Sequence, residues 1–410
     1  MKTYNNLFEQ IVSLENIEAS IYEAALGKSA RDKKEAYRVL ENPKKHTKKL
    51  HSILLSGDYH FSKGDLFTIN EHSPTKKVRQ IKKPRFIYDQ IVHHCIIRIL
   101  KEIILHSLYF HAYGSLPDRG IHKVATYIHK WFQHDFENSC FCFQGDFHHY
   151  YENVDKDILK EILYRMFYKD DRLIDLLIKS VDAHPESGIP LGFYTSVWYA
   201  MIYAMRFDHF IESIKGNVHY LRFMDDIIFL GNNKEDLHRI KNEARDYLRE
   251  NLKLELKPNW QIFPIARLVK EDKNNHDNDI IYGRDLDFLG FRFFQYKTIL
   301  RKTNFSSLMN SVRSVEKLQA KSREVGRNLV TFHDAASLIS KMGMLSHTNG
   351  YKIFQEIQSR VDLDAVNEVI KMNSKNFETY KELQMTKKFA DRLLLGVDDK
   401  IIDPSVLWYF

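Results

Sequence analysis

The spacing of apolar and polar positions divides the chain into three parts. Residues 1–56 carry apolar positions at helical spacing beside faces rich in Lys, Glu and Ala, which predicts helices. From 57 to 84 the pattern changes to short apolar pieces, FTIN and VRQI, separated by Gly and Pro, which is typical of strands. Residues 87–108 again show helical spacing and are apolar enough to predict one largely buried helix. We therefore expect a helical start followed by a mixed region.

The middle of the chain alternates strand-like and helical segments. CFCFQGDF (140–147) is apolar and aromatic and ends on an acid, whereas 154–168 has helical spacing. Residues 219–231 predict a β-hairpin with Met-Asp-Asp at its tip. Strands are expected again over 285–300, and the rest, 304–410, is expected to be helical. Loops are predicted at 112–120, 184–192 and 271–279, and further helices through Trp131, over 196–214 and over 234–251.

Composition narrows the class of protein. With 410 residues, 44% hydrophobic and 28% charged, the chain has the balance of a globular protein of more than one lobe. Its net charge of +7 is concentrated in 44–49, 76–85 and 317–327, which indicates either a polyanionic partner, nucleic acid before membrane, or a merely solvated face. No apolar run is long enough for a bilayer, and no secretory leader is evident. The three cysteines indicate neither a disulfide framework nor a zinc site.

Three aspartates stand beside apolar strands. Asp146 ends one strand, and Asp225 and Asp226 lie at the tip of the hairpin. Unpaired buried carboxylates are costly, so the pair marks either a satisfied surface loop or a cation site, and Asp146 alone is also explained as a strand-end cap. If the strands share a sheet, the three carboxylates converge, and hard oxygen ligands select Mg²⁺ or Mn²⁺. Two such ions are the apparatus of in-line phosphoryl transfer.

An ordered set of motifs resembles the reverse transcriptases. RFMDDIIFLG is similar to their catalytic hairpin, GDFHHYYENVD (145–155) to their first carboxylate motif, and GIPLGFYTSVWYAMIY (188–203) to the motif after it. LKLELKPNW and LDFLGFRF are similar to the next two, and KVRQIKKP, DQIVHHCIIRIL and YGSLPDRG to the fingers motifs of bacterial members. The resemblance covers roughly 57–300.

The resemblance implies a role for each matching residue. Asp146, Asp225 and Asp226 would be catalytic and, with the Phe147 carbonyl, would hold two Mg²⁺ ions, with Mn²⁺ as a substitute. Tyr151 would be the steric gate that excludes a 2′-hydroxyl, while Tyr150 is better suited to the core. Further roles are implied as follows: dNTP binding by Lys77, Arg79 and Gly192; protonation of pyrophosphate by Lys257, with Lys253 as a competitor; and template or primer binding by Arg119, Gly188 and Arg222.

The same resemblance implies the architecture. It is an α+β right-hand polymerase with an antiparallel-sheet palm, fingers, a helical thumb and a helical N-terminal extension. The expected boundaries are an extension over 1–56, fingers over 57–139, a palm over 140–300, a thumb over 301–370 and a helical tail over 371–410.

Departures from the family pattern indicate a sub-family. Phe223 stands in place of the usual tyrosine, Leu191 in place of glutamine, and Val197 where group II intron enzymes have proline and diversity-generating ones glutamine. The chain best resembles the compact bacterial enzymes of the unknown group associated with anti-phage defence. A cytoplasmic enzyme that copies a cognate structured non-coding RNA into DNA, through an RNA/DNA hybrid, is expected. The alternatives are an untemplated or protein-primed nucleotidyltransferase, with Tyr409 as a conceivable primer, and a catalytically idle RNA-binding scaffold.

Overall fold

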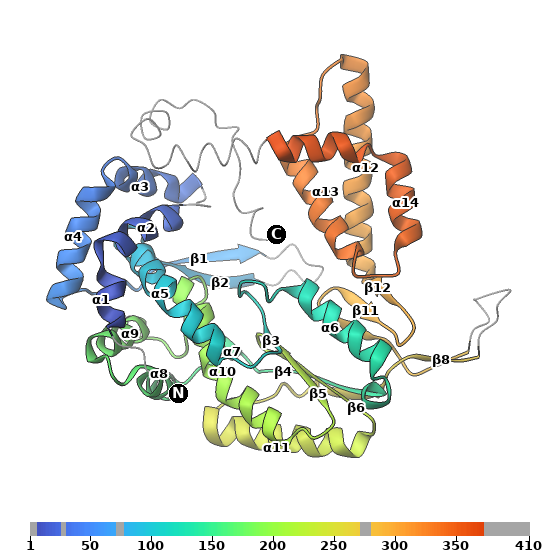
Figure 1. Cartoon of the computed structure of the whole chain (residues 1–410), viewed down its shortest axis with the longest axis horizontal. Helices are drawn as coiled ribbons and strands as arrows, with labels where there is room; N and C mark the ends of the chain where they lie inside the picture. The colour runs from blue at the N-terminus through green and yellow to red at the C-terminus, as the bar shows by residue number, and fades with distance from the viewer. Residues whose placement is uncertain (1–5, 26–29, 71–77, 271–279, 373–410) are drawn as a thin grey trace.

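The computed structural model describes residues 6–25, 30–70, 78–270 and 280–372. Helices and antiparallel sheets alternate along these segments, so the predicted α+β class is confirmed (Figure 1). None of the helices in the described ranges has the length and apolarity that a bilayer crossing requires.

The N-terminal helices pack on the long helix that follows them. The last of them begins at Pro43 behind an Asn42 cap and ends at Gly57, whose φ of 77° lies in the left-handed region. The buried Asn16 amide donates to the Cys95 carbonyl at 3.1 Å and so ties the second helix to the long one. The helical pattern predicted for 1–56 is therefore confirmed in the described residues. These helices are α1 (Leu7–Val12), α2 (Leu14–Ala25), α3 (Ala30–Leu40), α4 (Pro43–Ser56) and α5 (Ile91–Ser107).

A strand pair and a short helical turn connect α4 to α5. Strands β1 (Asp65–Asn70) and β2 (Val78–Lys83) form a two-stranded antiparallel sheet, as the pieces FTIN and VRQI predict. The single helix expected over 87–108 is wrong at its start, because Ile87 has non-helical dihedrals inside the turn η1 (Phe86–Gln90). The regular helix begins only at Ile91, seven residues after Pro84 has ended the strand segment.

The central sheet has five strands in the order β3-β5-β6-β4-β7. All neighbours are antiparallel except β3 and β5. Alternate residues of β6 enter two different cores, with Ile227 and Phe229 on one face and Ile228 and Leu230 on the other. A strand buried on both faces must be apolar throughout, which explains the unbroken run IIFL. The strands are β3 (Ala112–Tyr113), β4 (Phe141–Asp146), β5 (His219–Phe223), β6 (Asp226–Gly231) and β7 (Gln261–Pro264).

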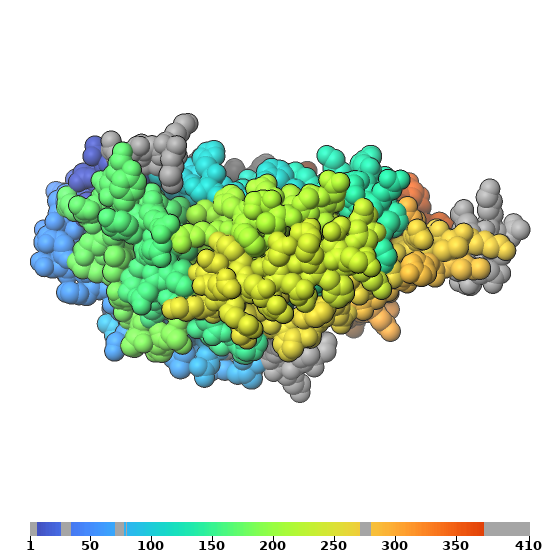
Figure 2. Space-filling view, turned by 90° about the horizontal axis from the view of Figure 1, so that it is seen from below, coloured from blue at the N-terminus to red at the C-terminus, as the bar shows by residue number. Residues whose placement is uncertain are grey.

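Helices cover the two faces of this sheet. Helix α11 packs on β4, β6 and β7 and against α10, and in Figure 2 it and the chain after it occupy the middle of the face seen from below. Residues of α6 share the core of the opposite face with β11. The helices of this region are α6 (Ile121–His134), the short turn η2 (Glu137–Ser139), α7 (Tyr150–Asn153), α8 (Lys156–Phe167), α9 (Asp171–Asp182), α10 (Tyr194–Ile214) and α11 (Lys234–Leu252).

A three-stranded sheet leads into the C-terminal helices. Their helical pattern is confirmed up to residue 372, and the tail over 373–410, with Tyr409, lies outside the described residues. A capping box between Thr331 and Asp334 starts the second of these helices. The elements are β10 (Leu286–Phe288), β11 (Phe291–Phe293), β12 (Thr298–Leu300), α12 (Lys302–Val325), α13 (Phe332–Leu345) and α14 (Tyr351–Arg360).

A separate ribbon was not expected from the sequence. Strands β8 (Arg267–Lys270) and β9 (Ile280–Tyr282) pair with each other and extend away from the sheet at the right of Figures 1 and 2. Val269, Ile280 and Tyr282 are all more than half exposed on it. The strands are too short and too exposed to give a clear two-residue alternation, so the pattern did not reveal them.

Candidate active site

Strand pairing brings the three aspartates together. Asp146, the last residue of β4, lies directly opposite Asp226, the first residue of β6, and Asp226 also pairs with Phe223 of β5. Met224 and Asp225 form the two-residue turn between β5 and β6. The predicted hairpin and its convergence with the strand of Asp146 are confirmed.

The site carries more negative charge than its surroundings neutralise. Burial, and then the charge of Asp146, raises the pKa of Asp225. Burial and the two neighbouring aspartates raise the pKa of Asp226 to about 7. One carboxylate oxygen of Asp146, Oδ1, is buried and has no hydrogen-bond partner. An acceptor left without a donor in this position marks a place for a cation.

Lys257 supplies one positive charge at the site. Its ammonium forms an ion pair with Oδ2 of Asp146, and its amide donates to the Asp146 carbonyl at 2.8 Å. The competing Lys253 instead pairs with Asp155 at 2.6 Å, on the exposed surface. Of the two lysines weighed from the sequence, the structure therefore brings Lys257 to the aspartates and Lys253 to a separate site.

The donor set fits a hard divalent cation. Among the described residues, no three His, Cys, Asp or Glu side chains are already arranged as a metal cage. The fit rests instead on the unpartnered Oδ1 of Asp146 beside the Asp225 carboxylate, both of which are oxygen donors of the kind Mg²⁺ and Mn²⁺ prefer. The buried Phe147 follows Asp146 directly and joins its strand to the turn, because its amide donates to the Asp225 carbonyl at 3.0 Å. A ligand role for the Phe147 carbonyl stays a prediction.

Tyr151 lies at the edge of this site, and Tyr150 lies in the core. Burial raises the pKa of the Tyr151 hydroxyl, and the nearby charge of Asp225 raises it further. Tyr150 is 2% exposed, and its hydroxyl donates to the carbonyl of Ala200 in α10. The expectation that Tyr150 lies in the core is confirmed. The two tyrosines begin the short helix α7.

Two glycines allow close approach of backbone to backbone. Gly188 has a φ of 74°, and a Cβ there would stand 2.2 Å from the Tyr151 carbonyl. Gly192 has a φ of 106°, and its Cβ would stand 2.3 Å from the Lys82 carbonyl. The loop is further joined to β2 because the Lys82 amide donates to the Leu191 carbonyl at 2.9 Å. Contacts of these glycines with template or dNTP stay predictions.

One of the two cations expected to bind triphosphate lies on β2. Arg79 is a residue of this strand and pairs with Ile69 of β1. Lys77 lies outside the described residues. The backbone contact between β2 and the Gly188–Gly192 loop brings this strand toward the segment that carries Tyr151.

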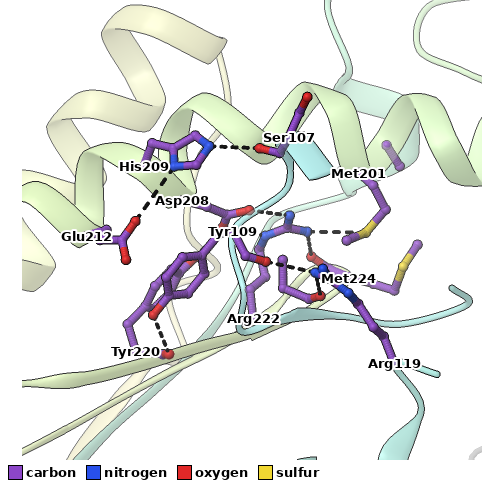
Figure 3. Close-up of polar contacts among 12 residues, drawn as sticks. Ser107, Tyr109, Arg119, Met201, Asp208, His209, Glu212, Tyr220, Arg222 and Met224 are labelled. Atoms are coloured by element: carbon purple, nitrogen blue, oxygen red, sulfur yellow. Dashed lines mark hydrogen bonds and ion pairs between the residues drawn. The ribbon is translucent and has the colours of Figure 1, made fainter. Parts of the chain in front are cut away.

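Arg222 does not have the role predicted for it, whereas the role predicted for Arg119 stays a prediction. Arg222 is fully buried and paired with Asp208, so the prediction that it contacts template or primer is wrong (Figure 3). Arg119 donates to the carbonyls of Tyr109 at 2.8 Å and Ala112 at 3.1 Å. Those bonds give it a structural role beside β3, and a nucleic-acid contact is not needed to explain it.

Asp208 is the residue that the sequence analysis missed. It is fully buried within α10 and accepts hydrogen bonds from both Tyr220 and Arg222 of β5. A signal was present, because Asp208 falls in the stripe that also contains Ala204 and Ile211, both fully buried. An acid inside an apolar stripe requires a partner, and Arg222 is the arginine closest in sequence to the catalytic pair.

Comparison with known proteins defines the class. Residues 69–292, more than half of the chain, match the family described as "Reverse transcriptase (RNA-dependent DNA polymerase)". The chain belongs to this family. Its α+β arrangement of helices and antiparallel sheets is the fold class that the motifs predict.

Individual relatives are distant. A Schizosaccharomyces pombe protein described as "Uncharacterized 91 kDa protein in cob intron" is 28% identical over 182 residues, which are 42% of this chain and 21% of that protein. The chain thus spans about a fifth of that relative. Apo telomerase from Candida tropicalis superposes with a TM-score of 0.45 at 11% identity, over 85% of this chain and 68% of that one. Its truncated form gives a TM-score of 0.41 at 13% identity, over 59% and 55%. Similarity at this level carries no argument about substrates or partners.

Proposed function

We propose that this chain copies a cognate structured RNA into DNA by two-metal nucleotidyl transfer at Asp146, Asp225 and Asp226. The observation that carries the proposal is the buried, unpartnered Oδ1 of Asp146 among carboxylates whose pKa values are raised. Carboxylates that repel one another in the absence of a counter-charge are typical of a cation-dependent site.

The aspartates would hold two divalent cations, together with the Phe147 carbonyl. When bound, the cations activate the attacking 3′-hydroxyl and stabilise the leaving pyrophosphate. The contribution of the chain is to fix the carboxylates: the β4–β6 register sets Asp146 against Asp226, and the turn presents Asp225 beside them. Rigid strands hold this geometry more closely than a loop would.

Neighbouring side chains complete the reaction. Lys257 contacts Asp146 and is placed to act as a general acid toward the departing pyrophosphate, which needs protonation as the bond to it breaks. Tyr151 packs under the sugar and excludes a 2′-hydroxyl. The close approach of Gly188 to its carbonyl fixes the position of the Tyr151 backbone. Arg79 and Lys77 bind the triphosphate, as the family resemblance implies, since a guanidinium can make paired contacts with phosphate.

The surface of α4 supports a structured RNA as the partner. Lys44, Lys45, Lys48 and Lys49 are exposed on this helix, and none of them has an acidic partner among the described residues. The like charges at 44/48 and 45/49 repel at one-turn spacing, and two of them lie in the first turn, where cations are unfavourable. A polyanion along this face would offset that repulsion. The role in anti-phage defence and the cytoplasmic location follow from the sub-family resemblance.

One experiment tests the function. Protein purified with its bound RNA is supplied with Mg²⁺ and the four dNTPs, and the DNA product and the RNA are both sequenced. Complementary product sequence supports templated synthesis, whereas product with no complement in the RNA supports the untemplated alternative. Asp225→Asn is the inactive control, and Asp246→Asn, an exposed acid of α11, is its charge-matched partner. Absence of incorporation by the wild type under all these conditions would contradict the proposal.

A further inference from the structure

A buried ion pair lies directly beneath the turn that carries Asp225. The side chains of Arg222 and Asp208 are both 0% exposed, and they form two parallel bonds, Nε to Oδ1 at 2.7 Å and Nη2 to Oδ2 at 2.5 Å. Burying two charges costs more than their attraction returns unless the remaining donors and acceptors are also satisfied. Here the Tyr220 hydroxyl donates to Oδ1 of Asp208 at 2.6 Å, and one nitrogen of Arg222, Nη1, remains for another partner (Figure 3).

The shorter of its two contacts is with the turn itself. Nη1 of Arg222 donates to the Met224 carbonyl at 2.8 Å, and it also lies 3.7 Å from Sδ of Met201. The Met224 amide donates to the Tyr113 carbonyl at 2.9 Å, and the Asp225 carbonyl accepts from the Phe147 amide at 3.0 Å. Three backbone groups of the two-residue turn are thus held by three different elements, namely β5, β3 and β4 with its extension. Met224 has a φ of 55°, a conformation that a non-glycine residue keeps only where its surroundings enforce it.

The turn needs such restraint because of what it presents. Asp225 lies beside Asp146, and two carboxylates at short range repel each other when both are ionised. A hairpin tip free to move would separate them. Tethering the carbonyl immediately before Asp225 to a buried arginine removes that freedom.

We propose that Arg222 and Asp208 are positioning residues for Asp225: they hold the Met224 carbonyl, so the Asp225 carboxylate stays beside Asp146 ready for a divalent cation. The inference rests on the proposed metal-binding role of these aspartates and adds the device that pre-forms their geometry. It also assigns Arg222 a role in positioning the turn, in place of the predicted contact with template or primer.

Helix α10 extends the same restraint to α7. Asp208 lies two turns after Ala200, whose carbonyl accepts from the Tyr150 hydroxyl at the start of α7. Tyr151, the residue proposed to contact the sugar, follows at once. Helix α10 therefore contacts both Arg222, which binds the turn, and Tyr150, which precedes Tyr151. It fixes the turn and the start of α7 relative to each other.

Two variants separate positioning from stability. The double variant Arg222→Met with Asp208→Leu removes both charges together, and replacing a whole buried pair by apolar residues is often tolerated by a fold. Arg222→Lys keeps a positive charge opposite Asp208. It loses the guanidinium, which binds both Asp208 and the Met224 carbonyl. Both are compared with the wild type by calorimetric titration with Mn²⁺ without nucleic acid or dNTP, and by hydrogen exchange at the Met224 amide.

The expected result is weaker Mn²⁺ binding by about tenfold or more in both variants, the effect of losing groups that orient metal ligands. Exchange at the Met224 amide is expected to be faster, and kcat is expected to fall while the KM for dNTP stays within about twofold. Arg98→Met is the control: Arg98 pairs with Glu23 near the N-terminal helices, so its loss lowers stability without changing Mn²⁺ affinity.

Each other outcome counts against the inference. A folded double variant with wild-type Mn²⁺ affinity and kcat would overturn it, since the pair would then only stabilise the core. If the double variant does not fold, Arg222→Lys decides by the same two measurements. Failure of the proposed function is seen separately, because Asp225→Asn would then bind Mn²⁺ as tightly as the wild type.

Discussion

The ammonium of Lys257 forms an ion pair with Oδ2 of Asp146, while Oδ1 of the same carboxylate is buried and unpartnered. One oxygen of the carboxylate thus pairs with a cation of the chain, and the other accepts no hydrogen bond. This relationship connects the two parts of the proposed chemistry, cation binding by the aspartates and proton donation by the lysine.

Replacing Lys257 tests the proton-donating role. Lys257→Met is expected to lower kcat by about 10²-fold or more, because a positioned general acid typically contributes 10²–10⁴-fold. The KM for dNTP should change little. Single-nucleotide incorporation measured across pH provides the readout, with Lys257→Arg as the variant that keeps the charge but not the acidity.

Lys253→Met is the matched control for that experiment. Lys253 lies four residues before Lys257 and pairs with Asp155 on the surface. Its replacement is expected to leave kcat within about twofold of wild type. Equal losses of kcat in the two variants would show that the positive charge of this segment, rather than one proton donor, explains the effect.

The acids make the metal-free protein sensitive to pH. The folded pKa of Asp226 is about 7, well above the ordinary value of 3.8, so folding favours the protonated form. Its contribution to the free energy of unfolding is therefore largest below pH 4, falls as pH rises, and is lost above pH 7. With a chelator present, Asp226→Asn should gain about 2 kcal/mol more stability over wild type at pH 8 than at pH 5.

Urea titrations of both proteins at the two pH values measure this difference. Addition of Mg²⁺ at pH 8 is expected to stabilise the wild type more than the variant. A gain from Asp226→Asn that is equal at pH 5 and pH 8 would contradict the raised pKa of Asp226.

Gly188 supports Tyr151 through its backbone. Gly188→Ala would force a Cβ to within 2.2 Å of the Tyr151 carbonyl, in a conformation that already disfavours side chains. We expect the free energy of unfolding to fall by about 2–4 kcal/mol and the preference for dNTP over rNTP to weaken, as it should more strongly in Tyr151→Ala. Gly216→Ala is the control, because its φ is 59° but nothing lies within 4 Å of its Cβ, so only about 1 kcal/mol is expected. Unchanged discrimination in Tyr151→Ala would refute the gate assignment.

The lysines of α4 are expected to bind RNA. Changing Lys44, Lys45, Lys48 and Lys49 together to Gln should weaken binding of the co-purified RNA and reduce the slope of log affinity against log salt by roughly the number of lost phosphate contacts. The same charge change on α11, at Lys234, Arg239, Arg245 and Arg249, is the control. Three of those four are ion-paired with acids of their own surface. Equal effects of the two variants would mean that net charge alone governs RNA affinity.

Most of the fold and the three aspartates were predictable because local patterns determine them. The apolar run after Asp226 and the tip residues Met224 and Asp225 predict a hairpin whatever else the chain does. The pairing of β4 with β6 followed from an assumption about neighbouring strands, which the family resemblance supported. Long-range relationships were not accessible in this way.

The roles of Arg222 and Arg119 show why the rest could not be read from the sequence. An arginine before a catalytic motif in a nucleic-acid enzyme suggests phosphate binding, and only the packing of α10 on β5 reveals that Arg222 is buried against Asp208. Likewise, the glycines at 188 and 192 are readable as sites of close approach, but the approaching groups are carbonyls of Tyr151 and Lys82, which are distant in sequence. Ion pairs and backbone contacts across the fold depend on tertiary packing.

A catalytic centre at the hairpin tip is tested most directly by the effect of Asp225→Asn on DNA synthesis, Mn²⁺ affinity and RNA affinity, measured on the same preparation. We expect at least a 10³-fold loss of synthesis, the scale of several kcal/mol of lost charge stabilisation, together with weaker Mn²⁺ binding and unchanged RNA binding. Synthesis within about tenfold of wild type, with Mn²⁺ bound as before, would contradict the claim that the acids of the hairpin tip are the catalytic centre.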